Sequence, residues 1–298
     1  MSFTIATTVD DALAALADGA RPIAGGTDLV VGARHGKAPL PDALVAIDRI
    51  EELADVQLDH DGVRVGALVT HADLVTDPVI VGSYTAIADA SALVGSPSTR
   101  HVGTVGGNVM NGSPAMDTGA PLTVLGARAQ LRSAGGSRTV SLDDLWTGPG
   151  RTSAAADELL VGLHLPAAQA RCGSAYVRLE YRRAMEIAVV GAAAGVTLAD
   201  DGTIASAAVA LAAVAPTILA VVGANDSLVG LTPAVAGPVI AELASDVAAP
   251  ISDLRASDRY RRHCIGVMAK RAVDAAARRA AGESIAVPVN RSIGIGAA

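Results

Sequence analysis

Two pairs of glycines, Gly25-Gly26 and Gly106-Gly107, constrain this chain more than any other feature. Glycine lacks a Cβ, so it adopts positive φ readily and lets a ligand approach the main chain, where successive N–H groups can converge on an anion. Thr27-Asp28 follows the first pair and precedes an apolar stretch, a pattern typical of a helix start, whose dipole favours negative charge. Either pair alone is better explained as a tight strand-to-helix turn. Together with their flanking residues they predict one phosphate-binding site.

Length and charge restrict the class of protein. With 298 residues the chain exceeds one typical domain, so two or three modules with a large buried core are expected. The formal net charge is −7 and no lysine-rich or arginine-rich face stands out, which argues against nucleic-acid and anionic-membrane partners. Aromatic residues make up 2% of the chain, so a bound planar ring would rest mainly against aliphatic groups and peptide planes.

The two cysteines bear on metal sites and on the cellular compartment. Cys172 and Cys264 are too few and too far apart for a zinc site, a disulfide framework or an iron–sulfur cluster held by this chain alone. A reducing cytoplasm therefore fits best, and no secretory signal is visible at the N-terminus. Residues 203–224 are uncharged, but they are rich in small residues and interrupted by Pro216, so no membrane span is expected.

Local patterns divide the first half of the chain into short elements. We expect a helix over residues 11–17 capped by Asp10, and then a strand at 21–24 that enters the first glycine pair. A hairpin of residues 56–59 and 63–66 is expected to open a second subdomain. The remaining expected elements are strands over 43–47, 129–132, 138–140 and 159–165, a capped helical turn at 141–146, and helices over 70–74, 83–94 and 117–125.

The second half reads as an antiparallel meander followed by helices, after a linker at residues 167–170. The expected strands are 175–182, 187–199 and 204–213, and the last two are joined by the hairpin signal Asp200-Asp201-Gly202. Helices are expected over 233–248 and 258–281. The second of these helices carries many arginines, which predicts a solvated face more readily than a docking surface.

Several short motifs are specific as a set because of their order and spacing. They are residues 24–29, 64–70, 100–108, 113–117 and 157–160, Leu165-Pro166, Tyr181-Arg182-Arg183 with Ile187-Ala188, and Tyr260-Arg261-Arg262. On these motifs the chain resembles, nearly end to end, the FAD-binding or medium subunit of molybdenum hydroxylases, the family of xanthine dehydrogenase and aerobic carbon monoxide dehydrogenase.

That resemblance implies an α+β fold with two main domains. The first is a PCMH-type FAD-binding domain over residues 1–168, made of two αβ subdomains at about 1–54 and 55–168. The second is a C-terminal α+β domain over residues 172–282 with a three-stranded antiparallel sheet and helices, followed by a tail at 283–298.

The resemblance also implies where the cofactor lies. In the family the two glycine loops hold the FAD pyrophosphate, and the isoalloxazine ring lies where the N-terminal subdomains meet the C-terminal domain. For Asp117, a cofactor contact and a helix cap are equally good explanations. The residues implied to bind FAD are Ala24, Gly25, Gly26, Thr27, Asp28, Leu29, Gly103, Thr104, Gly106, Gly107 and Asn108, with a weaker match at Val94, Asp117, Leu160 and Arg178. No side chain is implied as a catalytic acid or base, and no metal ligand is implied.

The chain departs from part of the family at residues 185–187. Carbon monoxide dehydrogenase-like members have Gly-Asp-Tyr there, with the tyrosine over one flavin face, whereas this chain has Met-Glu-Ile. Because Ile187 cannot stack as an aromatic ring does, that face is covered by Tyr181, covered by an aliphatic contact, or open.

The implied function is electron transfer through a noncovalent FAD. Electrons would leave a molybdenum cofactor on a large subunit, pass two-iron iron–sulfur clusters on a small subunit, and reach FAD here before an acceptor such as NAD, oxygen or a quinone. A dimer of heterotrimers in the cytoplasm is implied. The alternatives are a stand-alone FAD-dependent oxidase or reductase that acts directly on a small molecule, and a scaffold without cofactor. Hydrolases and dinucleotide-binding βαβ folds are disfavoured, because neither Gly-x-Ser-x-Gly nor a suitably placed Gly-x-Gly-x-x-Gly is found.

Overall fold

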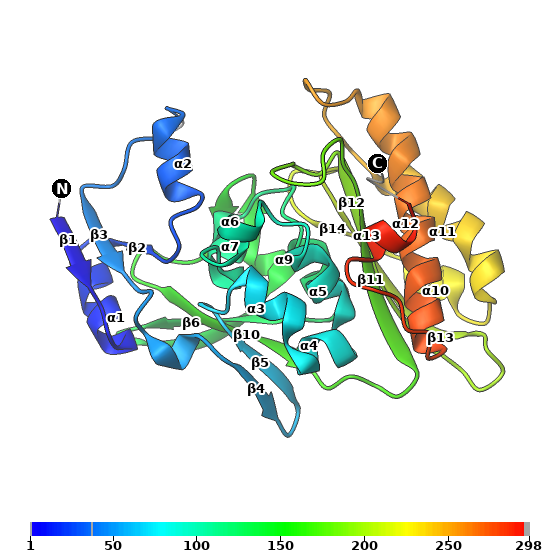
Figure 1. Ribbon diagram of the computed structural model, residues 1–298, viewed down its shortest axis with the longest axis horizontal. Coiled ribbons are helices and arrows are strands. Elements are labelled where there is room, and N and C mark those ends of the chain that lie inside the picture. Colours follow the sequence, from blue (N-terminus) through cyan, green and yellow to red (C-terminus); the bar gives the residue numbers. More distant parts are fainter. Residues whose placement is uncertain (1, 37, 295–298) are drawn as a thin grey trace.

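The computed structural model describes residues 2–36 and 38–294. Figure 1 shows three sheets that follow one another along the long axis of the molecule, with the longest helices at the C-terminal end. The first sheet has strand order β1-β3-β2, the second β4-β5-β10-β6-β7, and the third β11-β12-β13-β14. A two-stranded ribbon, β8 (Trp146–Gly148) with β9 (Arg151–Thr152), is formed by residues that come between two strands of the second sheet in the sequence.

The first sheet is parallel and small. Its elements are β1 (Ser2–Ile5), α1 (Val9–Ala17), β2 (Arg21–Ile23), α2 (Leu29–Arg34) and β3 (Ala43–Ala46), followed by a 3-10 turn at Glu51–Leu53. We expected Asp10 to cap α1, but Thr8 does so: its hydroxyl accepts from the Asp11 N–H at 3.1 Å and its own N–H donates to the Asp11 carboxylate. This reciprocal capping box satisfies two free donors at the helix start.

The second sheet is antiparallel and confirms the expected hairpin. Its strands are β4 (Val56–Asp59), β5 (Gly62–Gly66), β6 (Arg128–Ser133), β7 (Gly136–Ser141) and β10 (Leu159–Pro166). Between β5 and β6, and after β7, the chain forms α3 (His71–Thr76), α4 (Pro78–Ser83), α5 (Thr85–Ser91), α6 (Pro97–Arg100), α7 (Val105–Asn111), α8 (Gly119–Val124) and α9 (Leu142–Leu145). All of these helices except α6 share one apolar core with the sheet.

The helix expected over residues 83–94 was wrong in its bounds, and another helix precedes it. Asp77 caps α4, with Pro78 at the first helical position, so helical structure begins several residues earlier than expected. The chain then breaks at Tyr84, whose buried side chain donates its hydroxyl to the Pro166 carbonyl at 2.8 Å. The helix expected over residues 83–94 thus corresponds to α5, which ends at Ser91, and α4 is a separate helix that was not expected.

The third sheet contains the three expected strands and a short fourth. They are β11 (Cys172–Leu179), β12 (Val190–Leu198), β13 (Ile204–Ala212) and β14 (Leu219–Ala220), all antiparallel. Helices α10 (Ala224–Leu228), α11 (Pro233–Val247) and α12 (Asp258–Ala280) pack with one face, whereas α5 and α8 contact the other. The sheet thus lies between the two domains' helices.

Alternation along β11 explains how it serves both domains. Successive residues of a strand point to opposite faces. Ala175 and Val177 belong to the core formed with α11 and α12, whereas Tyr176 belongs to the core of the second subdomain and Ser174 accepts a hydrogen bond from α5. The two domains therefore share a continuous apolar interior.

The arginines of α12 correct our expectation of a uniformly solvated face. Arg261 is only 3% exposed and donates to the Val189 carbonyl and, at 2.7 Å, to Asp253. Arg279 donates to Asp89 of α5 at 2.6 Å. Arg259 and Arg271, by contrast, are exposed.

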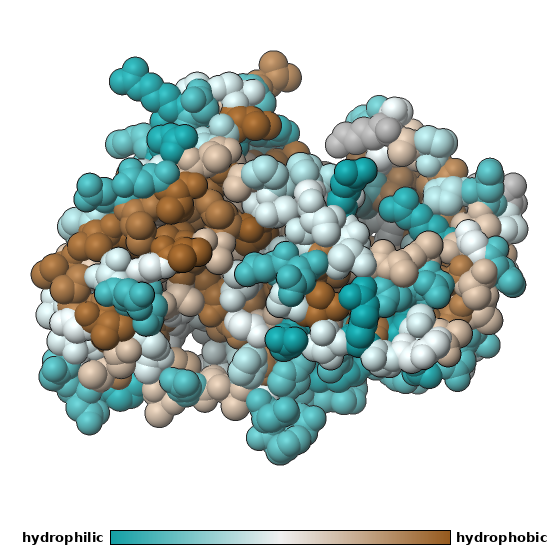
Figure 2. All heavy atoms as spheres, turned by 180° about the vertical axis from the view of Figure 1, so that it is seen from behind, coloured by the Kyte–Doolittle hydropathy of each residue, from teal (hydrophilic) through white to brown (hydrophobic). Residues whose placement is uncertain are grey.

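Three further observations concern the C-terminal segment, the lengths of the helices and the surface. The segment expected as a tail contains α13 (Val289–Ser292), and Val289 and Asn290 are fully buried. Within residues 2–36 and 38–294, no helix combines the length and the apolar character that a bilayer crossing requires. In the rear view of Figure 2, apolar side chains gather over the end of the molecule formed by the C-terminal domain, whose exposed apolar residues include Val222, Val229 and Val235.

Candidate functional site

The two glycine segments lie against each other. The first glycine loop, residues 24–28, connects β2 to α2. The second glycine loop, residues 101–107, comprises the connection from α6 to α7 and the first turn of α7, which contains Gly106 and Gly107. A Cβ added to Gly25 would overlap the carbonyl group of Val102, and one added to Gly103 would lie 3.5 Å from Thr27 Oγ1. Only a residue without a side chain lets the first loop approach the second this closely.

Main-chain donors are available on the first loop. Gly26 has φ +66°, and α2 begins three residues later. Within the described part of the chain, the N–H groups of Gly25, Gly26 and Thr27 donate to no acceptor. The first N–H groups of a helix and its preceding turn are suited to anions because they lack intrahelical partners.

The second loop differs, because most of its amides are already used. The N–H of Gly106 donates to the Ala67 carbonyl at 2.9 Å, that of Gly107 to Thr104 Oγ1 at 3.1 Å, and that of Gly103 to the Thr99 carbonyl at 2.7 Å. Gly106 is also needed for close packing, since a Cβ there would be 2.5 Å from the Ala67 oxygen. Gly107, by contrast, is exposed to solvent.

A histidine that the sequence analysis did not single out supports the second loop. The N–H of His71 donates to the Gly103 carbonyl at 3.1 Å, and its ring is buried beside Ser91. Burial, with a smaller effect of the nearby Arg100 charge, lowers the pKa of His71 to about 4. The ring is therefore neutral near pH 7 and packs as a neutral group beneath the loop.

Asn108 and Asp117 link this region to its surroundings. Asn108 Oδ1 accepts from Thr118 Oγ1 at 2.6 Å. Asp117 caps no helix: it is buried and accepts from the Tyr176 hydroxyl and from Arg178 Nη1, both at 2.8 Å. The side chain of Asp117 is thus directed to the C-terminal domain.

Arg178 lies between two carboxylates at the seam of the domains. It is fully buried, with Nη1 donating to Asp117 and Nε donating to Glu180 at 3.0 Å. Burial alone lowers the pKa of Arg178, but the charges of Asp117 and Glu180 outweigh it and hold that pKa above its ordinary value. Burial raises the pKa of Asp117 against the effect of Arg178. The cluster holds one cation for two carboxyl groups.

Val94 and Leu160 lie nearby in different settings. Val94 is half-buried, and its carbonyl accepts from Arg100 Nη1 at 3.0 Å. Leu160 is 4% exposed and belongs to the core of the second subdomain, opposite Leu131. The Leu160 side chain therefore packs in this core and not on the surface.

A loop of the C-terminal domain reaches the segment that precedes the second glycine loop. The N–H of Met185 donates to the Gly95 carbonyl at 2.9 Å, and Thr99 Oγ1 donates to Met185 Sδ at 3.8 Å. Tyr181 is tied to the Arg255 carbonyl at 2.6 Å, and its ring, like Ile187, is about half exposed. Met185 thus joins this loop of the C-terminal domain to the segment that precedes the second glycine loop.

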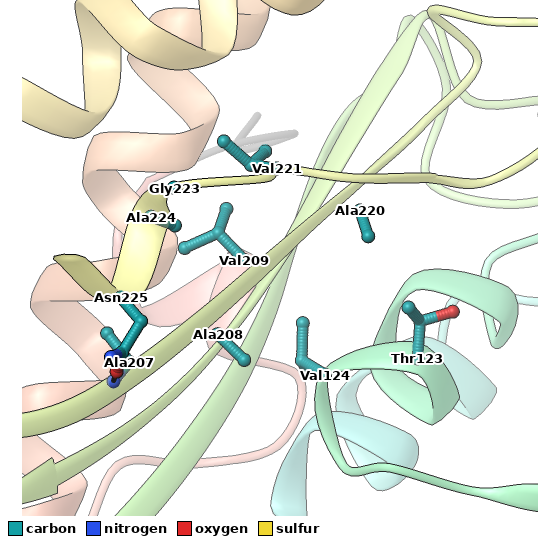
Figure 3. Close-up of a pocket in the computed structure, with 10 residues that line it drawn as sticks. All are labelled: Thr123, Val124, Ala207, Ala208, Val209, Ala220, Val221, Gly223, Ala224 and Asn225. Atoms are coloured by element: carbon teal, nitrogen blue, oxygen red, sulfur yellow. Dashed lines mark hydrogen bonds between the residues drawn. The ribbon is translucent and has the colours of Figure 1, made fainter. Parts of the chain in front are cut away.

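A cavity lies away from this region, between α8 and the third sheet (Figure 3). Its volume is about 200 Å³, and Figure 3 shows small, mostly apolar side chains around it, including Val124, Ala208 and Val209. None of the residues that line it was expected to bind FAD. The glycine loops therefore lie apart from this cavity.

Comparison with known proteins matches the two halves of the chain to two family models. Residues 1–168 match the family described as the FAD binding domain in molybdopterin dehydrogenase, and residues 175–276 match the CO dehydrogenase flavoprotein C-terminal domain. A putative xanthine dehydrogenase FAD-binding subunit of Escherichia coli is 32% identical over 95% of this chain and 98% of its own length. The carbon monoxide dehydrogenase medium chain of Afipia carboxidovorans is 33% identical, covering 90% and 92%. Carbon monoxide dehydrogenase of Hydrogenophaga pseudoflava has a chain of TM-score 0.88 and 30% identity, covering 94% of this chain and 98% of its own.

Proposed function

Since this chain belongs to the family of FAD-binding medium subunits of molybdenum hydroxylases, we propose that its two glycine loops hold the diphosphate of a noncovalent FAD. The observation that carries the proposal is the contact of Gly25 with Val102, which brings the unpaired amides of the first loop beside the second loop. Amides without partners at a helix start fit a diphosphate, because they supply donors that need no rearrangement.

The residues divide the work of binding. We expect the amides of Gly25, Gly26 and Thr27 to donate to phosphate oxygens. The exposed Gly107 would leave the backbone of the second loop accessible, while Gly106 packs that loop against Ala67. Ala24, Asp28, Leu29, Gly103, Thr104 and Asn108 complete the two loops. Asp117 and Arg178 would shape the wall at the domain seam, and Val94 and Leu160 would support it. When bound, FAD supplies the redox chemistry, and these residues hold, orient and shield it.

The surrounding complex follows from the family. The relatives are medium subunits of multi-subunit enzymes, which implies large and small partners. We propose that a molybdenum cofactor on the large subunit and two-iron iron–sulfur clusters on the small subunit deliver electrons here, in a dimer of heterotrimers. The apolar area in Figure 2 supports a partner, because large apolar patches mark interaction sites. Both cysteines are free thiols, which suits the reducing cytoplasm, a location that cell fractionation would test.

Gly107→Asp tests the loop assignment. A Cβ at this position meets only Thr104 Oγ1, at 3.1 Å. An acidic residue in the first turn of α7 interacts favourably with the helix dipole, so the variant should fold normally. The new carboxylate would repel a diphosphate, so FAD content after purification should fall more than tenfold, as measured by absorption of the released flavin.

Gly82→Asp is the matched control. Gly82 is an exposed glycine on α4 with no atom near its added Cβ, and it lies outside both loops. This variant should keep the wild-type FAD content. A Gly107→Asp chain that is folded and fully loaded with FAD would refute the assignment of the second loop.

A further inference from the structure

The short helix α13 lies across the seam between the two domains. The N–H of Val289 donates to Asp89 of α5 at 2.9 Å, and the next residue, Asn290, is fully buried against β11. Figure 1 shows α13 beside α12, in front of β11. Two consecutive residues near the end of the described chain therefore tie α13 to an element of each domain.

Asn290 holds both main-chain groups of a single strand residue. The N–H of Arg178 donates to Asn290 Oδ1 at 2.9 Å, and Asn290 Nδ2 donates to the Arg178 carbonyl at 2.8 Å. Because β11 is an edge strand, its outer main-chain groups need partners from outside the sheet. The asparagine amide takes the place of a neighbouring strand at this one position.

The residue whose main chain Asn290 holds, Arg178, also carries the buried guanidinium. Arg178 has no exposed surface, and its side chain lies between Asp117 and Glu180, which are themselves 9% and 4% exposed. A guanidinium forms directed, planar hydrogen bonds, so its contacts depend on where the main chain places it. A buried cation displaced from its partners leaves uncompensated charge on both sides.

We propose that Asn290 is a positioning residue for the cofactor site: it fixes the main chain of Arg178 and thereby keeps the guanidinium between Asp117 and Glu180 at the seam. The inference rests on the proposed function, because it matters for FAD only if the flavin lies at that seam. Asn290 acts through Arg178 and needs no contact of its own with the cofactor.

The test measures FAD dissociation from the full chain. Asn290→Ala should raise the FAD Kd about tenfold, corresponding to the loss of two positioning hydrogen bonds. It should also alter the visible absorption band of the bound flavin at saturating FAD. Asn290→Leu removes the same bonds while keeping the side-chain volume, and it replaces the alanine variant should that variant fail to fold.

Two controls separate positioning from general loosening. Val289→Ala trims a fully buried side chain of the same helix but leaves Asn290 in place. Asn225→Ala removes another asparagine that accepts from a strand amide, that of Ala207 at 3.1 Å, away from Arg178. Both should change the FAD Kd less than twofold and leave the flavin band unchanged.

A double-mutant cycle tests whether Asn290 acts on FAD binding through Arg178. In an Arg178→Lys background, which lacks the planar fork, Asn290→Ala should lose most of its effect on FAD affinity. Equal effects of Asn290→Ala and Val289→Ala, or additivity with Arg178→Lys, would overturn the positioning role while the proposed function stands. A wild-type chain that binds no FAD would overturn both.

Discussion

At the scale of single residues, Gly25 is the position where substitution should do most harm. Its φ is not in the left-handed region, so alanine is acceptable to the backbone, but the added Cβ would overlap the Val102 carbonyl group. The two loops must then separate. We expect Gly25→Ala to lower the free energy of unfolding by about 2 kcal/mol and to weaken FAD binding more than tenfold, measured by denaturant titration and flavin fluorescence.

Gly32→Ala provides the matched control seven positions later. Gly32 lies inside α2, and a Cβ there meets no atom within 4 Å. Replacing glycine by alanine in a helix interior stabilises by up to about 1 kcal/mol. A stable, flavin-loaded Gly25→Ala protein would mean that the contact between the loops is unimportant for binding.

The residues of the site could be predicted only in part. Glycine pairs indicate from the sequence alone that the backbone is approached closely, and the structure does place the two loops in contact. Glu180 was missed although a signal existed, because residues two apart on a strand share a face and Arg178 precedes it by two. Asn290 offered no signal, since its partner is 112 positions away. The assignment of individual FAD contacts stays a prediction.

At the scale of elements, local rules predicted the order of strands and helices well and failed where a distant contact decides. The β4–β5 hairpin, the meander β11 to β13 and the helices α11 and α12 follow from turn residues and periodicity, which are local. Helix α4 was not expected, and Tyr84, where α4 ends, bonds a carbonyl 82 positions away, which no local window contains. The strand β14 is only two residues long, too short for a pattern.

Helix α12 also shows that local sequence rules do not reveal distant contacts, and its arginines allow a prediction. Its arginines look alike in sequence, yet Arg261 is buried against the sheet and binds Asp253, whereas Arg259 is exposed. Arg261→Ala would leave the Val189 and Ala213 carbonyls and the Asp253 carboxylate without this donor. We expect a loss of about 3 kcal/mol in the free energy of unfolding, measured by urea titration.

Arg259→Ala on the same helix serves as the comparison. An exposed arginine contributes little, so the change should stay within about 0.5 kcal/mol. Similar losses from the two variants would show that the buried contacts of Arg261 do not stabilise the fold.

At the scale of the whole molecule, the two domains form one unit. Tyr176, Ala193 and Ile218 of the C-terminal domain belong to the same apolar core as the second subdomain. The Asp89–Arg279 pair joins α5 to α12, with the Asp89 side chain fully buried. Because charges and apolar surface are both buried at the seam, separating the domains would expose them. We propose that a cofactor bound at the seam would therefore meet walls of fixed spacing.

An FAD bound by this chain would need a source of electrons, and the identity of that source gives the last prediction. Two cysteines cannot form an iron–sulfur cluster, so a route from a molybdenum centre must lie on other chains. Native mass spectrometry of the complex purified from its own cells should show two copies each of this chain, a large subunit and a small subunit. The isolated chain should retain FAD yet show no reduction of that flavin by a substrate of the complex. If the isolated chain is fully active alone, the stand-alone oxidase or reductase is correct and the subunit assignment falls.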